Sequence, residues 1–123
     1  MADELSLSLN FSLDRWSGQV VLQPSLADLS ITMTGNVVSE GVQQIGTSKE
    51  NLDILSDHST LGWFLILNLD DTNYVGYGED ADNPFGEAKA GEWGAMRISR
   101  SVSNVSVKAV GDACWVYFVV LED

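Results

Sequence analysis

The sequence LSLSLNFSLD, residues 5–14, alternates apolar and polar residues almost without fault. Successive side chains of a β-strand point to opposite faces, so this pattern is typical of a strand with one buried and one solvent-exposed face. We therefore expect residues 1–14 to form an N-terminal strand or arm that docks on a sheet or on another subunit, with an ordinary edge strand of the same domain as the alternative. The candidate interface residues in this stretch are Leu5, Leu7, Leu9, Phe11 and Leu13.

The remainder of the chain, residues 15–123, predicts short strands separated by turn residues. Residues 29–34 alternate apolar and polar side chains and are followed by Gly-Asn, so residues 37–45 are expected to return as the second strand of a hairpin. Thr47 and Glu50 have the spacing of a helix capping box, which predicts at most one helical turn because the apolar spacing does not continue.

Two apolar segments are expected to carry the core. Residues 61–69 form an apolar run that is typical of a central strand covered on both faces, and residues 114–121 are likewise apolar on both faces. Trp63 and Trp115 lie in these runs and are predicted to be core residues. Short strands with frequent turn signals and no sustained helical period indicate an all-β fold, an antiparallel β-sandwich or jelly-roll-like single domain over residues 15–123.

Charge and composition exclude several functions. The 123 residues include 18 acidic and 6 basic ones, a net charge of −12, whereas affinity for a phosphate backbone comes from lysine and arginine. We therefore expect no nucleic acid partner. No apolar run reaches the roughly 18 residues that span a bilayer, and the acidic N-terminus does not suit a signal peptide, so no membrane contact is expected. The single cysteine, Cys114, allows no intramolecular disulfide and reads as a small buried thiol.

Few residues suggest catalysis or metal binding. His58, the only histidine, is adjacent to Asp57 and Ser59, but neighbouring side chains diverge and do not form a nucleophile, base and orienting acid by themselves. The acidic loop over residues 79–83 could offer oxygen atoms to calcium, yet it lacks the spacing and the glycine of an EF-hand. We expect a protein that is not an enzyme, with no cofactor and no metal site; a cation at the acidic loop is the alternative.

Two tryptophans sit beside turn residues and are the other candidate interface residues, Trp16 and Trp93. Exposed aromatic rings can anchor a protein interface or stack on a sugar. A carbohydrate-binding β-sandwich on a particle surface is therefore an alternative function.

Several motifs in order resemble a family of small structural proteins of tailed bacteriophages. They are QQIGTSKENLD at residues 43–53, GWFLILNLDDTNYV at 62–75, AKAGE at 88–92, VKA at 107–109 and VVLED at 119–123. The resemblance covers roughly the last two-thirds of the chain. It implies a virion component made in the host bacterial cytoplasm.

Among virion roles we expect a capsid decoration, or cement, protein that binds the phage major capsid protein and stabilises capsomer contacts on the capsid surface. Closed three-fold symmetry favours a homotrimer. A tail, baseplate or head-completion subunit is the alternative within the virion.

Overall fold

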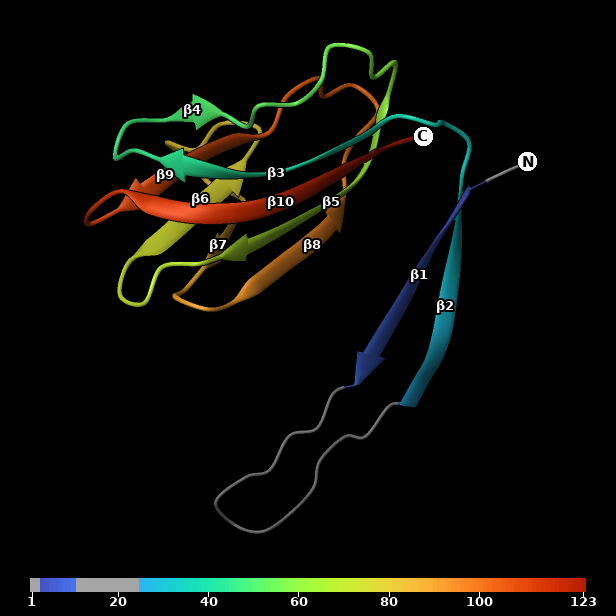
Figure 1. Ribbon diagram of the computed structural model, residues 1–123, viewed down its shortest axis with the longest axis horizontal. Coiled ribbons are helices and arrows are strands. Elements are labelled where there is room, and N and C mark those ends of the chain that lie inside the picture. The colour runs from blue at the N-terminus through green and yellow to red at the C-terminus, as the bar shows by residue number, and fades with distance from the viewer. Residues whose placement is uncertain (1–2, 11–24) are drawn as a thin grey trace, which may run out of the picture. The chain divides into compact units, whose positions relative to one another are not determined.

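The computed structural model describes residues 3–10 and 25–123, and every helix or strand assigned in them is a β-strand. The chain divides into two compact units, residues 1–33 and 34–123. The strands of both units are labelled in Figure 1. We expected the division after residue 14; the structure places it after Met33 because the strand that ends there pairs within the N-terminal unit.

The N-terminal unit contains an antiparallel pair, β1 (Asp3–Asn10) and β2 (Ser25–Met33). Leu5 is the register partner of Ile31 and Leu7 of Leu29, and the register shifts between Leu7 and Leu9. The strand predicted at the N-terminus is thus confirmed as far as Asn10, while Phe11, Leu13 and Trp16 lie outside the described residues.

The predicted hairpin of residues 29–34 with residues 37–45 was wrong. The second segment forms β3 (Val38–Ile45), which pairs along its length with β10 (Cys114–Glu122) at the opposite end of the sequence. The Gly-Asn pair does not close a turn between β2 and β3. The backbone N–H of Asn36 instead donates a hydrogen bond to the carboxylate of Glu122, at 3.0 Å.

The second unit is an antiparallel β-sandwich of two four-stranded sheets, as the sequence predicted. One sheet has the order β3–β10–β5–β8 and the other β4–β9–β6–β7, and they lie one behind the other in Figure 1. The remaining strands are β4 (Glu50–Asn51), β5 (Leu61–Asn68), β6 (Tyr74–Gly78), β7 (Gly86–Ala88), β8 (Trp93–Arg97) and β9 (Ser106–Val110).

The chain changes sheet at almost every connection of the sandwich. Only β6 and β7 are both consecutive in sequence and neighbours in one sheet. Gly91, in the turn before β8, has a φ of 76°, a left-handed conformation that glycine adopts without strain. No helical turn forms after Thr47, because the chain there enters the short strand β4, which pairs with β9.

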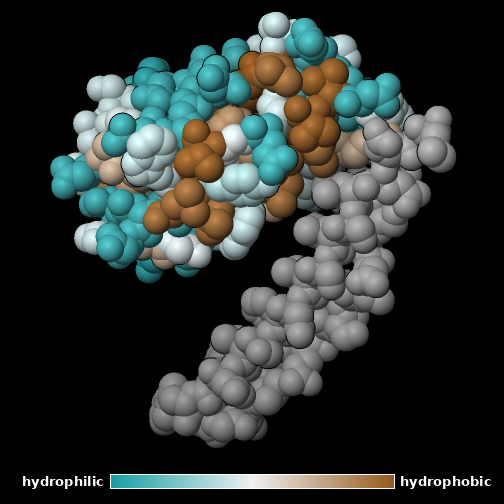
Figure 2. All heavy atoms as spheres, viewed as in Figure 1, coloured by the Kyte–Doolittle hydropathy of each residue, from teal (hydrophilic) through white to brown (hydrophobic). Residues whose placement is uncertain are grey.

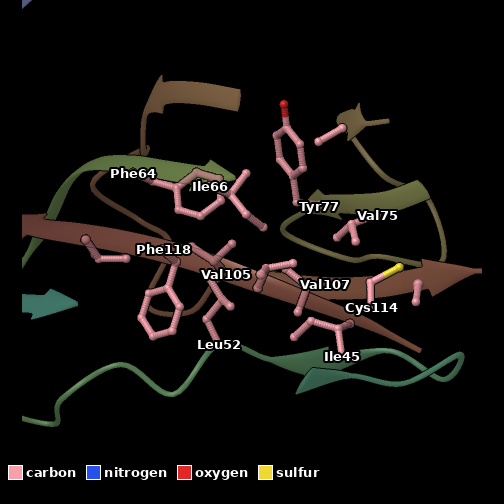
Figure 3. Close-up of a cluster of buried hydrophobic side chains, with 14 of the residues drawn as sticks. Ile45, Leu52, Phe64, Ile66, Val75, Tyr77, Val105, Val107, Cys114 and Phe118 are labelled. Atoms are coloured by element: carbon pink, nitrogen blue, oxygen red, sulfur yellow. The ribbon is translucent and has the colours of Figure 1, made fainter. Parts of the chain in front are cut away.

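The core is formed by the alternate residues of both sheets that point inward. Phe64 and Ile66 from β5 meet Val75 and Tyr77 from β6, with the rings of Phe64 and Tyr77 tilted at 60° and their centroids 5.5 Å apart (Figure 3). Cys114 is buried among these residues, as expected. The position of β5 between β10 and β8 confirms it as a central strand.

Candidate functional site

The outward side of the sheet β3–β10–β5–β8 is unusually apolar. Strict alternation of burial along these strands sends every second residue away from the core. We call this surface the outer face. Hydrophobic side chains gather on the side of the molecule that Figure 2 shows. Its residues are Val38, Glu40, Val42 and Gln44 on β3, Trp115, Tyr117, Val119 and Leu121 on β10, Trp63, Leu65 and Leu67 on β5, and Trp93, Ala95 and Arg97 on β8.

The predictions that Trp63 and Trp115 lie in the core and that residues 61–69 are covered on both faces were wrong. Trp115 is 51% exposed, and Trp63 lies on the outer face with part of its side chain accessible. Alternation forces this outcome, because Cys114, Val116 and Phe118 point into the core and the residues between them must point out. A run that is apolar on both sides does not reveal which side is inward.

An aromatic pair and a carboxylate occupy one part of the outer face. The ring of Trp93, which is 58% exposed, meets the ring of Tyr117 edge-on, with centroids 6.2 Å apart and planes at 85°. The hydroxyl of Tyr117 donates a hydrogen bond of 2.5 Å to the carboxylate of Glu40, and this bond raises the pKa of Tyr117 above its usual value. Trp93 is thus held in place by packing across the sheet.

Charge is nearly absent from the outer face although the chain carries a net charge of −12. Its only carboxylate is Glu40, and its only cation is Arg97, whose guanidinium lies 2.7 Å from the carboxylate of Asp123. The acidic residues of the sandwich therefore lie elsewhere, and the outer face has the composition of a surface that contacts protein.

The candidate interface residues that the structure describes belong to two different units. Trp93 is on the outer face of the sandwich, whereas Leu5, Leu7 and Leu9 are positions of β1 in the N-terminal unit. Most of the outer face was not predicted from the sequence, because its residues come from four strands spread over residues 38–121. The signal that could have found them was the apolar character of both sides of residues 61–69 and 114–121.

The acidic loop binds lysines of its own chain. The ammonium of Lys49 lies 3.1 Å from Asp80 and 3.4 Å from Asp82, and that of Lys108 lies 3.2 Å from Asp82. Backbone and lysine hydrogen bonds hold the pKa of Asp80 below its ordinary value, and hydrogen bonds from the two lysines do so for Asp82. Among the residues that the structure describes, no group of histidine, cysteine and acidic side chains is arranged to hold a metal ion.

His58 makes a structural contact with a serine that is distant in sequence. Its Nε2 lies 2.8 Å from Oγ of Ser39, which also accepts a hydrogen bond from the backbone N–H of Leu55. Nucleophilic catalysis would need an exposed serine and an acid that orients the histidine, but Ser39 is only 2% exposed and Nδ1 of His58 has no hydrogen-bond partner. The neighbouring Ser59 instead bonds to Glu122.

An apolar pocket of about 230 Å³ opens beside the core, lined by residues of β5, β6 and β8. Phe64, Tyr77, Met96 and Ile98 form its floor and walls, and Phe85, which is 81% exposed, also lines it. The pocket brings no cluster of ionisable side chains together, so it offers packing space without a reaction centre.

Glu122 anchors the end of β10 to two other segments. Its carboxylate accepts hydrogen bonds from the backbone N–H of Ser59 at 2.7 Å, from the hydroxyl of Ser59 at 3.1 Å and from the backbone N–H of Asn36 at 3.0 Å. These donors favour the ionised form and lower the pKa of Glu122 below its ordinary value. The side chain is therefore a structural anchor of the sandwich.

Acid is expected to weaken this anchor. A carboxyl whose pKa is lower in the folded than in the unfolded state stabilises the fold above its unfolded pKa, and this contribution is lost as the pH falls through the folded pKa. The difference in Tm between the wild type and Glu122→Gln should thus be largest at neutral pH and shrink in acid. Thermal unfolding followed by circular dichroism checks this, with the exposed Glu87→Gln as the control. A Tm difference that does not change with pH would contradict the assignment.

Comparison of the chain with protein-family models, with curated proteins and with solved structures finds no match. In the described part of the chain, no helix is long and apolar enough to cross a membrane. The likeness to phage structural proteins, which rests on sequence motifs, stays a prediction.

Proposed function

We propose that this protein is a non-enzymatic structural component of a tailed-bacteriophage particle, a decoration protein that binds the major capsid protein on the capsid surface and assembles with copies of itself. The observation that carries the proposal is the outer face, an apolar and almost uncharged surface on a strongly acidic chain. Such a surface suits a protein that works by packing against protein.

The division of the chain into two units supports the same role. The sandwich provides a stable body, while the N-terminal unit contains the strand whose alternating sequence predicts docking on another chain. We assign the contact with the capsid protein to this N-terminal unit. Such a contact would cover an apolar strand and strengthen capsomer contacts by adding buried area that the coat protein lacks.

Carbohydrate binding is favoured less by the outer face. Sugar rings stack on exposed aromatic faces, but Trp93 and Tyr117 meet at 85° and so do not form one flat platform. The carboxylate of Glu40 is also already occupied by the hydroxyl of Tyr117.

Copy number and position in purified particles test the proposed function. Cryo-electron microscopy of virions of the phage that encodes this chain should show hundreds of copies at capsomer contacts, with the N-terminal unit against the coat protein. Particles assembled with a chain lacking residues 2–14 should lose most of this density. A handful of copies at the tail or portal, or none in the particle, would overturn the decoration role.

A further inference from the structure

We propose that the outer face is the surface through which two copies of this chain associate, sheet against sheet, about a two-fold axis parallel to the strands. The dimer rests on the proposed function, because it names the partner that covers the outer face. All the residues involved belong to the sandwich unit.

The outer face is continuous across all four strands of its sheet. The register places Val42, Tyr117, Leu67 and Trp93 side by side in one row across β3, β10, β5 and β8. The next row contains Val119, Leu65 and Ala95, which continue the apolar surface from β10 to β8. The largest apolar patch on a soluble protein often marks a contact surface, so a continuous apolar face of this kind suits a protein partner.

Charge makes a second copy the partner that fits this face. Two molecules with a net charge of −12 repel each other over most of their surfaces. The outer face carries one carboxylate, Glu40, and one guanidinium, Arg97, which pairs with the carboxylate of Asp123, so the face itself holds little charge. Two copies can approach through the outer face with little repulsion between negative charges. A strongly basic partner would have only one carboxylate on this face to pair with.

The positions of these two charges select the direction of the two-fold axis. Glu40 lies on the edge strand β3 and Arg97 on the opposite edge strand β8. If the axis runs parallel to the strands, β3 of each copy faces β8 of the other, and each Glu40 faces the strand that carries the other copy's arginine. If the axis lies in the interface perpendicular to the strands, β3 faces β3, and like charges lie on facing strands. Avoiding the approach of the two Glu40 carboxylates therefore favours the parallel axis.

The size of the face sets the expected strength of the contact. Four strands about 4.8 Å apart, each contributing outward positions over about 20 Å, give a plane of roughly 400 Å² per copy. Two such faces bury on the order of 800 Å² in total, a size typical of weak and transient protein contacts. The contact should therefore be a reversible dimer in the micromolar range.

Analytical ultracentrifugation of the full-length protein tests the contact. The wild type should sediment as a monomer–dimer equilibrium. Val119→Lys, in the middle of the outer face, places a long charged side chain beside Glu40 at two symmetric points of the interface, where it must lose its water, and should raise the dissociation constant at least about tenfold. Phe85→Lys makes the same change of charge at a residue that is 81% exposed and outside the outer face, and it should leave dimerisation unchanged. Far-UV circular dichroism verifies that each variant is folded.

A charge exchange tests the direction of the axis without altering the apolar rows. Glu40→Arg alone should weaken the dimer about tenfold, because arginines then lie on facing strands, and adding Arg97→Gln, which frees the carboxylate of Asp123 to attract the new arginine, should restore most of the affinity. Equal affinities for the single and double variants would overturn the parallel axis. A wild type that stays monomeric, a trimer in place of a dimer, or unchanged dimerisation of Val119→Lys would overturn the self-association surface.

The two proposals fail in different experiments. A protein that dimerises as described but is absent from virions refutes the decoration role and leaves the self-association surface standing. A protein that decorates capsids in many copies but remains monomeric in solution refutes the self-association surface alone.

Discussion

Asn68→Leu is expected to destabilise the sandwich by about 3–5 kcal/mol, although leucine and asparagine have similar shapes and the site is fully buried. The side-chain amide of Asn68 donates hydrogen bonds to the carbonyl of Asn73 at 2.8 Å and to that of Ala88 at 3.1 Å. Its Oδ1 accepts one from the backbone N–H of Asp70 at 2.9 Å. Leucine would leave these three backbone groups without their partner, and each buried group that loses a hydrogen bond costs about 1–3 kcal/mol.

Urea unfolding followed by far-UV circular dichroism measures this loss. The matched control is Asn104→Leu, which makes the same change at an exposed site and should alter stability by no more than about 0.5 kcal/mol. If Asn68→Leu unfolds at the same urea concentration as the wild type, these hydrogen bonds do not hold the turn after β5 in place.

The strands themselves were largely predictable from sequence because alternation and apolar runs report burial directly. Residues 61–69 and 114–121 became the two central strands β5 and β10 of one sheet. The partner of β3 was not predictable in this way. A local hairpin with residues 29–34 and a pairing with the distant β10 satisfy the same alternation, and only the assembled sheet selects the second.

The structural roles of single polar residues within apolar segments could not be predicted from periodicity. Asn68 ends an apolar run and reads as one more strand residue, yet its side chain joins the turn after β5 to the end of β7. Glu122 reads as a solvated residue near the end of the sequence, yet it receives hydrogen bonds from two other segments. Their partners are distant in the chain, so only the fold reveals them.

The candidate site was predictable only in part for a related reason. Trp93 stood out because it follows turn residues, but the outer face around it depends on which side of β5 and β10 points inward. The inward side is set by the opposing sheet, whose core residues Val75 and Val107 belong to the same buried cluster as Phe64 of β5 and Phe118 of β10. No local pattern in either strand encodes that choice.

Gly94→Ala is expected to destabilise the sandwich by about 2–3 kcal/mol, opposite to what strand propensity alone predicts. Glycine within a strand usually costs stability, so alanine should help where it fits. A Cβ atom at Gly94, however, would lie 2.7 Å from Cζ of Tyr77, and one at Gly86 would lie 2.7 Å from the same ring. The ring of Tyr77 is buried over these two glycines and packs on Phe64, so it has little room to move.

Gly41 provides the matched control because it is also a strand glycine of the same sheet. A Cβ atom there meets the ring of Phe118 at 3.7 Å, an ordinary contact, so Gly41→Ala should be neutral or up to about 1 kcal/mol stabilising. In the background of Tyr77→Leu, which removes the ring, the cost of Gly94→Ala should fall by at least about 1 kcal/mol, as a double-mutant cycle from urea unfolding would measure. Equal costs of Gly94→Ala in both backgrounds would show that the close approach of Tyr77 is not the cause. The expected coupling would instead establish that the ring of Tyr77 packs between β7 and β8. It fits there because Gly86 and Gly94 have no side chains.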